Sequence, residues 1–182
     1  MRHELLWFID HVKRSNGIHM LKFIEWSPYN RMASTLIGYS DASGVGMGIW
    51  FLGEYTGFQC PPPTEGPKNL IFFYEGLAIC LAFYLGTKYG CNSIAIYSDS
   101  TNAIDMYSSL RMKRVYNSIL LSAVDFTINT LITTKVYYVP SNQNIIADYL
   151  SRFLNADALR LAPNLNIQVF EPPWDALGVV KK

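Results

Sequence analysis

The sequence predicts an α/β fold in which a mixed five-stranded sheet is flanked by helices. Three short strand patterns separated by turn residues follow one another between residues 35 and 59, which predicts an antiparallel unit. A long apolar helical pattern follows near residues 69–88. Two further strand patterns, near 93–98 and 135–139, are separated by helical sequence. Strands linked by helices pair in parallel, so three antiparallel strands should be joined by two parallel ones.

The individual elements follow from the same hydrophobic periodicity and from turn residues. The expected order is a helix near residues 3–14, strands near 35–41, 46–52 and 55–59, a helix near 69–88, a strand near 93–98, helices near 101–110 and 115–131, a strand near 135–139 and a helix near 143–153. The first and fourth strands are then parallel neighbours.

Size and charge set limits on function. The chain has 182 residues, of which 50% are hydrophobic and 14% aromatic, which is enough to bury a sizeable core as one domain. The formal net charge is +1, so the molecule as a whole does not attract nucleic acid strongly. Any phosphate contacts must come from a local patch of cations.

Four acidic residues occupy four different contexts, and Asp41 is the first. It ends a strand pattern and precedes Gly44, Gly46 and Gly48. Asp and Gly are favoured in hairpin turns, because Asp bonds to the local backbone and Gly adopts left-handed conformations. Taken alone, Asp41 fits a turn residue better than a catalytic one.

Glu75 lies in the most apolar segment of the chain. From Leu70 to Gly86 it is the only carboxylate, and no basic residue stands among its neighbours. A helix this apolar is mostly buried, and an isolated buried carboxylate is costly unless it is paired, protonated or bound to a cation. Lys68 and Lys88 are too far along the helix to pair with it. The alternative is that Glu75 marks a solvated edge of the helix.

Asp99 and Asp148 complete the set. Asp99 ends an apolar strand pattern and precedes Ser100, so it fits a helix cap, but it also stands where open α/β sheets bind ligands. Asp148 lies in the final helical pattern, four residues before Arg152. By itself it fits an exposed ion pair worth about 0.3 to 0.5 kcal/mol.

The order of the four acids, on a hairpin strand, an apolar helix, a strand end and a final helix, resembles that of the ribonuclease H family. The resemblance is strongest to the ribonuclease H domain that follows the reverse transcriptase of retroelements. Sequence near both ends of the chain is similar to that around this domain in tyrosine-recombinase retroelements. The matching motifs are Ser40-Asp41-Ala42-Ser43, Glu75-Gly76-Leu77-Ala78, Tyr97-Ser98-Asp99-Ser100, and Val139-Pro140 through Asn144 and Ala147-Asp148 to Leu150-Ser151-Arg152.

The resemblance implies a metal-dependent endonuclease that hydrolyses the RNA strand of RNA–DNA hybrids. It implies two Mg²⁺ ions, replaceable by Mn²⁺ and held by the catalytic residues Asp41, Glu75, Asp99 and Asp148. Asp41 would bridge both ions, Glu75 and Asp99 would hold the ion at the leaving group, and Asp148 would help to hold the ion that activates water. Carboxylates suit such hard cations. No small-molecule cofactor is implied, and a reverse transcriptase module is an expected partner besides the hybrid.

On this interpretation residues 1–33 are an amino-terminal helical extension, residues 34–155 are the ribonuclease H-like domain, and residues 156–182 are a carboxyl-terminal tail. The candidate contacts to nucleic acid are Ser43, Arg152 and a basic cluster after the helix that follows Asp99. That cluster consists of Arg111, Lys113 and Arg114. A solvated loop between helices explains the three cations equally well.

Two features depart from the family pattern. Many relatives carry a histidine in the loop before the last acid, but here His3, His11 and His19 all precede Asp41. No polymerase stands upstream in this sequence. These departures leave open a second interpretation, in which the chain is a catalytically weak or inactive nucleic-acid-binding or interaction module retained from a retroelement. The four intact acids favour the enzyme.

The remaining features concern location. Cys60, Cys80 and Cys91 are odd in number and lack metal-ligand spacing, which predicts reduced thiols in an intracellular protein, cytoplasmic or nuclear. The longest fully apolar stretch, residues 76–86, is too short to span a bilayer. The first residues lack the apolar core of a secretory signal. Neither membrane association nor secretion is therefore expected.

Overall fold

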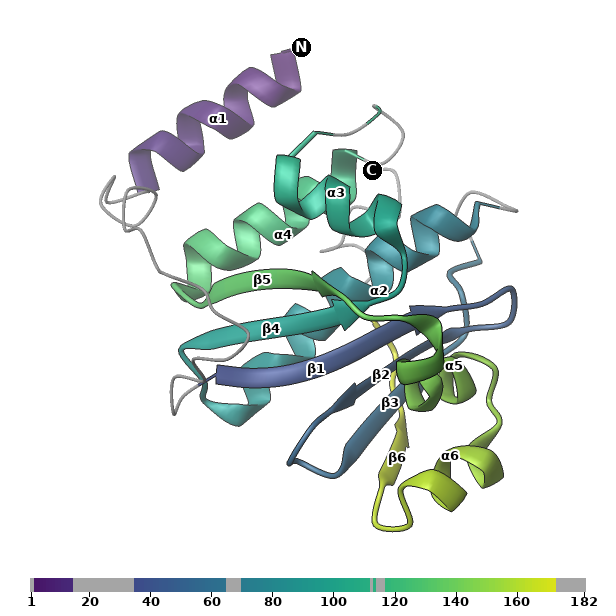
Figure 1. Ribbon diagram of the computed structural model, residues 1–182. Coiled ribbons are helices and arrows are strands. Elements are labelled where there is room, and N and C mark those ends of the chain that lie inside the picture. Colours follow the sequence, from purple (N-terminus) through teal and green to yellow (C-terminus); the bar gives the residue numbers. More distant parts are fainter. Residues whose placement is uncertain (1, 15–34, 65–69, 112, 114–116, 173–182) are drawn as a thin grey trace. The chain divides into compact units, whose positions relative to one another are not determined.

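A computed structural model describes residues 2–14, 35–64, 70–111, 113 and 117–172 (Figure 1). The chain divides into two compact units, residues 1–33 and 34–182. In the first unit the structure describes the helix α1 (Arg2–Arg14), where the sequence predicted a helix. The second unit holds all of the sheet.

The sheet is mixed, as predicted, but it has six strands rather than five, in the order β5-β4-β1-β2-β3-β6 (Figure 1). Strand β1 pairs antiparallel with β2 and parallel with β4, β2 pairs antiparallel with β3, and β4 pairs parallel with β5. The strands are β1 (Thr35–Ala42), β2 (Met47–Phe51), β3 (Thr56–Cys60), β4 (Ser93–Ser98), β5 (Thr133–Tyr138) and β6 (Asn166–Val169).

The sixth strand comes from the segment that the sequence analysis assigned to a tail. Strand β6 pairs in parallel with β3, and it follows the helix α6 (Asn155–Leu161), which was also not predicted. The four residues of β6 alternate between polar and apolar, but three of them are exposed and the fourth is half-buried, so the segment is too short and too exposed to stand out as a strand. Pairing with β3 makes it a strand, and the sheet therefore extends beyond the predicted boundary at residue 155.

Helix α2 (Ile71–Gly86), continued by the 3-10 turn η2 (Thr87–Tyr89), is the central helix of the fold. It packs on β1, β2 and β4 and also contacts the helices α3 (Thr101–Ser109) and α4 (Asn117–Thr130) (Figure 1). Because it is covered on both sides, α2 is apolar all round. Residues 71–89 are long and apolar enough to cross a membrane, but 61% of the segment is buried, as expected of a core helix.

Helix α5 (Ile145–Ser151), preceded by the 3-10 turn η4 (Ser141–Gln143), lies on the opposite face of the sheet and contacts β1, β2, β3 and α6. Alternation along β2 separates the two layers. Ile49 and Phe51 pack in the core that contains α2, whereas Trp50 packs with Leu150 of α5. The sheet edge where β1 and β4 end therefore lies between two helical layers.

A row of four aromatic rings crosses the sheet and supports its register. Trp50 of β2, Tyr39 of β1, Tyr97 of β4 and Tyr137 of β5 are directly paired across neighbouring strands. Their successive ring centroids are 5.0, 5.3 and 5.4 Å apart, and each pair is stacked. Such cross-strand pairs contribute about 0.2 to 1 kcal/mol each. The row helps to fix the parallel pairing that brings the carboxyl ends of β1 and β4 together.

Candidate metal centre

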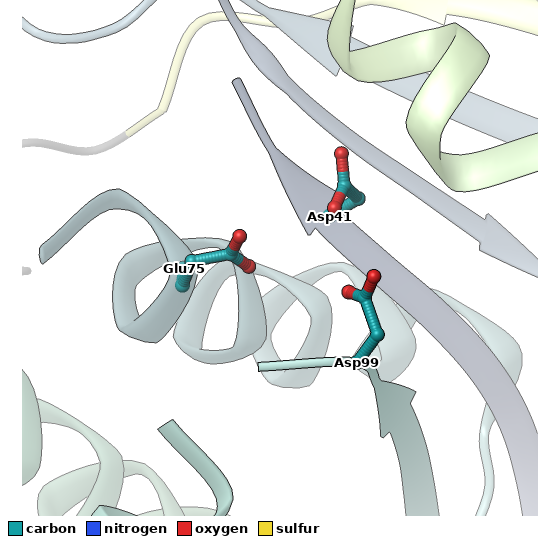
Figure 2. A group of neighbouring side chains, drawn as sticks. All are labelled: Asp41, Glu75 and Asp99. Atoms are coloured by element: carbon teal, nitrogen blue, oxygen red, sulfur yellow. The ribbon is translucent and has the colours of Figure 1, made fainter. Parts of the chain in front are cut away.

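Three of the four predicted acids meet at the carboxyl ends of β1 and β4. Asp41 lies in β1 opposite Gly48 of β2, and Asp99 directly follows β4. Glu75, in the second turn of α2, points toward both of them (Figure 2). One carboxylate oxygen of each residue lies within 4.8 Å of the other two. We call Asp41, Glu75 and Asp99 the acidic cluster.

Asp41 is not the turn residue of the hairpin. Its strand continues to Ala42, and the turn is held by Ser43, whose amide donates to the carbonyl oxygen of Gly46 at 2.8 Å. The Ser43 hydroxyl accepts hydrogen bonds from the amides of Val45 and Gly46, both at 3.2 Å. Ser43, rather than Asp41, therefore makes the hydrogen bonds that close the turn.

Ser43 has a structural role, and its predicted contact with nucleic acid stays a prediction. Only 6% of this residue is exposed. Its hydroxyl also donates to the carbonyl oxygen of Ser151 at 2.7 Å, so it joins the hairpin to α5. The hydroxyl therefore holds the backbone of the hairpin turn and of the end of α5 together.

Asp99 does not cap a helix. The residue that precedes α3 is Ser100, and its side chain makes no capping hydrogen bond. Asp99 instead accepts a hydrogen bond at its Oδ1 from Nδ2 of Asn144, at 3.3 Å. The same amide group donates to the carbonyl oxygen of Ser40 at 3.0 Å, and Asn144 is only 1% exposed. Asp99 is thus held facing the cluster from the start of α5.

Glu75 as a whole is half-buried. Its Oε2 is buried and has no hydrogen-bond partner within the described part of the chain. The pKa of this carboxyl is raised from 4.5 to about 9, mainly by burial and then by the charges of Asp41 and Asp99, against the effect of a hydrogen bond from the amide of Ala42. An unpartnered buried oxygen is costly. A bound cation would remove that cost.

The charged form of the Asp41 carboxyl is also disfavoured by burial, but less than that of Glu75. The pKa of its carboxyl is raised from 3.8 to about 6, mainly by burial; a hydrogen bond from Ser151 lowers it, and the charges of Asp99 and Asp148 contribute to the rise. Carboxylates this close together resist full ionisation at neutral pH unless a cation joins them. A set of carboxylate oxygens fits hard divalent cations such as Mg²⁺ or Mn²⁺.

Asp148 borders the acidic cluster without joining it. Its Oδ1 lies 2.7 Å from Nε of Arg152, and the two side chains are 37% and 53% exposed. This is the ion pair that the helical spacing alone predicts. The charge of Asp148 nevertheless contributes to the raised pKa values of Asp41 and Glu75, so it lies within electrostatic reach of the cluster.

The predicted basic cluster is only partly visible. Arg111 and Lys113 are exposed just beyond the end of α3, whereas Arg114 lies outside the described residues. Contact between these cations and nucleic acid stays a prediction, as does contact through Arg152.

Sequence reasoning missed two polar residues of the site. Asn144 contacts Asp99, and Ser151 donates from Oγ to Oδ2 of Asp41 at 2.7 Å. Both stood in the last motif, but no role was assigned to them. Asn144, Ala147 and Ser151 share one helical face and are all buried. A polar pair on the buried face of a short helix was the available signal.

Comparison with solved structures identifies the fold. Ribonuclease H1 from the halophilic archaeon Halobacterium salinarum NRC-1 matches with a TM-score of 0.55 and 15% identity, over 68% of this chain and 99% of that chain. The chain has a ribonuclease H-like fold. LC11-RNase H1, solved in complex with an RNA/DNA hybrid, matches with a TM-score of 0.56 and 14% identity, again over 68% and 99%.

A further ribonuclease H-like match is the N-terminal RNase H domain of a Mycobacterium tuberculosis protein, with a TM-score of 0.51 and 15% identity over 71% of this chain and 99% of that chain. No protein-family model and no curated protein matches the sequence. At such low identities the similarity establishes the ribonuclease H-like fold, and the chemistry has to be argued from the site.

Proposed function

We propose that this chain is a metal-dependent ribonuclease that hydrolyses the RNA strand of RNA–DNA hybrids. The observation that carries the proposal is the acidic cluster, in which Glu75 holds one buried oxygen without a partner among the described residues. Its position between β1, β4 and α2 of a ribonuclease H-like sheet supports the assignment. A cluster of this kind is unfavourable for stability, so a functional reason for it is needed.

Asp41, Glu75 and Asp99 would hold the cation, Mg²⁺ or Mn²⁺, with Asp148 adding a carboxylate from α5. When bound, divalent ions supply an activated water and stabilise the charge that develops on the leaving oxygen. The contribution of this chain is orientation. Strands β1 and β4 fix the backbone positions of Asp41 and Asp99, and the packed helix α2 fixes Glu75. The products would carry 3′-hydroxyl and 5′-phosphate ends.

Recognition of a hybrid is supported by the fold and by one relative that was solved with an RNA/DNA hybrid. A wide, shallow minor groove that displays 2′-hydroxyl groups distinguishes such a duplex from DNA. Arg152 and the exposed Arg111 and Lys113 are candidate phosphate contacts. With so few cations and a net charge of +1, binding should be weak, with a log-log salt slope of roughly −2 to −4.

We further propose that the chain derives from a retroelement, works beside a reverse transcriptase module and acts inside the cell. The motif from Asp148 through Leu150 to Arg152 supports this origin. No histidine stands between Val139 and Asp148 to serve as the loop histidine of many relatives. The intact acidic cluster nevertheless favours an enzyme over an inactive module.

Incubation with end-labelled substrates tests the proposal. Wild-type protein should cut the RNA of a hybrid with Mg²⁺ or Mn²⁺ and should leave single-stranded RNA and duplex DNA largely intact. Asp41→Asn should abolish cleavage, whereas Asp105→Asn, which changes an exposed acid of α3, should not. Absence of cleavage by wild type with either metal would support the inactive module, and equal cutting of all three substrates would contradict hybrid specificity.

A further inference from the structure

Two serine hydroxyls join α5 to the β1–β2 hairpin in opposite directions. Ser43 Oγ of the hairpin donates to the carbonyl oxygen of Ser151, and Ser151 Oγ donates to Oδ2 of Asp41. Both hydrogen bonds are 2.7 Å long and buried. The last turn of α5 therefore receives one hydrogen bond from a side chain of the hairpin and gives one to an acid of the cluster.

Glycines of the hairpin allow α5 to come this close. A Cβ at Gly48, opposite Asp41, would collide with the carbonyl oxygen of Ala147 and the amide nitrogen of Ser151. A Cβ at Gly46 would lie 2.9 Å from the carbonyl oxygen of Ser151. The helix backbone thus rests directly on β2. As a result Ser151 is fully buried, and its hydroxyl faces a carboxylate rather than water.

The hydroxyl of Ser151 has a choice of two acceptors. It lies 2.7 Å from Asp41 Oδ2 and 2.9 Å from the carbonyl oxygen of Asp148, one turn earlier in α5. A hydroxyl carries a single hydrogen. The carboxylate is the nearer acceptor, and hydroxyl–carboxylate hydrogen bonds are the stronger kind when the acid is ionised. The hydrogen therefore belongs mainly to the bond with Asp41.

We propose that Ser151 is a positioning residue, whose hydroxyl holds the Asp41 carboxylate in one orientation before any cation binds. Among the described residues, Asp41 then accepts a hydrogen bond from Ser151 of α5, while the other two acids of the acidic cluster lie on its α2 side. The catalytic meaning of this inference rests on the proposed function. The orientation itself does not, because the hydrogen bond exists without metal.

Ser43→Ala is a matched control for Ser151→Ala. Each variant removes one buried 2.7 Å hydrogen bond between α5 and the hairpin, but only Ser151→Ala removes a bond to Asp41. Ser43→Ala also removes the hydrogen bonds that the Ser43 hydroxyl accepts from the amides of Val45 and Gly46. If Ser151 merely stabilised the contact between helix and hairpin, Ser43→Ala would disturb Asp41 at least as much as Ser151→Ala. The melting temperature of the full chain should fall in both variants, and at least as far in Ser43→Ala.

The first measurement is the χ1 rotamer of Asp41 in metal-free, isotope-labelled full chain, obtained from three-bond NMR couplings. A single rotamer is expected in wild type and Ser43→Ala, and an average over rotamers in Ser151→Ala. A single rotamer in Ser151→Ala overturns the proposal. If Ser151→Ala does not fold, Ser151→Cys serves instead, because it keeps the bulk of the side chain and donates only weakly.

The second measurement is Mn²⁺ binding by calorimetry. Ser151→Ala should raise the Kd by about 10-fold or more, as loss of a residue that orients a metal ligand typically does, and Ser43→Ala should leave it nearly unchanged. An unchanged Kd in Ser151→Ala overturns the positioning role while leaving the proposed function intact. If wild type neither binds Mn²⁺ nor cuts hybrids, the proposed function fails, and the rotamer measurement still decides whether Ser151 orients Asp41.

Discussion

Helices α2 and α5 bring acids to the same edge of the sheet in opposite ways (Figure 1). Helix α2 is 16 residues long, almost wholly buried, and delivers Glu75 with one oxygen that has no partner within the described residues. Helix α5 has seven residues, and its acid, Asp148, is partly exposed and paired with Arg152. The polar residues Asn144 and Ser151, at its two ends, hold Asp99 and Asp41.

The two helices therefore have different roles: α2 supplies a carboxylate whose charge is not compensated, and α5 orients acids by hydrogen bonds. On the α2 side one oxygen of the Glu75 carboxylate is buried and has no hydrogen-bond partner among the described residues, which lowers the stability of the metal-free protein. On the α5 side the charge is already compensated, and hydrogen bonds fix direction. Changes on the α2 side should therefore affect metal dependence and pH dependence most, and changes on the α5 side should act through geometry.

The largest effect is expected for Glu75→Gln. It should abolish hybrid cleavage and raise the melting temperature of metal-free protein at pH 8, because folding at that pH makes Glu75 take up a proton, and a neutral Gln of the same shape avoids this cost. Asp148→Asn should not raise the melting temperature, since its charge is paired and partly solvated. Glu54→Gln, at an exposed acid of the β2–β3 turn, is the control. A Glu75→Gln variant that cleaves normally and melts lower than wild type would make Glu75 a structural residue.

The second prediction concerns pH. The folded pKa values of Asp41 and Glu75, about 6 and about 9, exceed their ordinary values of 3.8 and 4.5. Over these windows the folded state binds more protons than the unfolded state, so the free energy of unfolding falls as pH rises. Metal-free protein should accordingly melt at lower temperature at about pH 9 than at about pH 6.

Two comparisons sharpen this pH prediction. Glu75→Gln should lose most of the slope above about pH 6, and millimolar Mg²⁺ should reduce it in wild type, because a bound cation favours the ionised carboxylates. Thermal melts across this range provide the measurement. A melting temperature that stays constant or rises with pH in metal-free protein would show that the acids are not desolvated.

The third prediction concerns the geometry on the α5 side. Gly48→Ala should push α5 from β2, destabilise the protein by about 1 to 3 kcal/mol and reduce cleavage, because the new methyl group would meet helix backbone. Gly44→Ala, in the same hairpin, is the control, since a Cβ there meets nothing within 4 Å. Denaturant melts and cleavage rates measure both effects. Equal stability of the two variants would mean that α5 is not held tightly against β2.

The smallest effect on stability is expected for Arg152→Gln. Its ion pair with Asp148 is exposed, so the free energy of unfolding should change by less than about 0.5 kcal/mol. If Arg152 contacts a phosphate, hybrid binding should weaken and its log-log salt slope should become shallower by about 1. A loss of stability well above 1 kcal/mol would show that the pair supports α5 structurally.

The sequence by itself determined the five-strand part of the sheet, the helices that link it and the order of the acids. These features depend on local periodicity and on turn residues, which act over a few positions. The same reasoning singled out Glu75, because a lone carboxylate in an apolar helix is visible without any tertiary contact. The metal roles of the acids and the domain boundaries remain predictions.

Only the tertiary structure decided the rest. Strand β6 is short and mostly exposed, and it pairs with the edge of β3. The bond between Ser151 and Asp41 joins residues 110 positions apart, and that between Asn144 and Asp99 spans 45. Which partner a polar side chain finds depends on how the layers pack, and no periodicity along the chain encodes that choice.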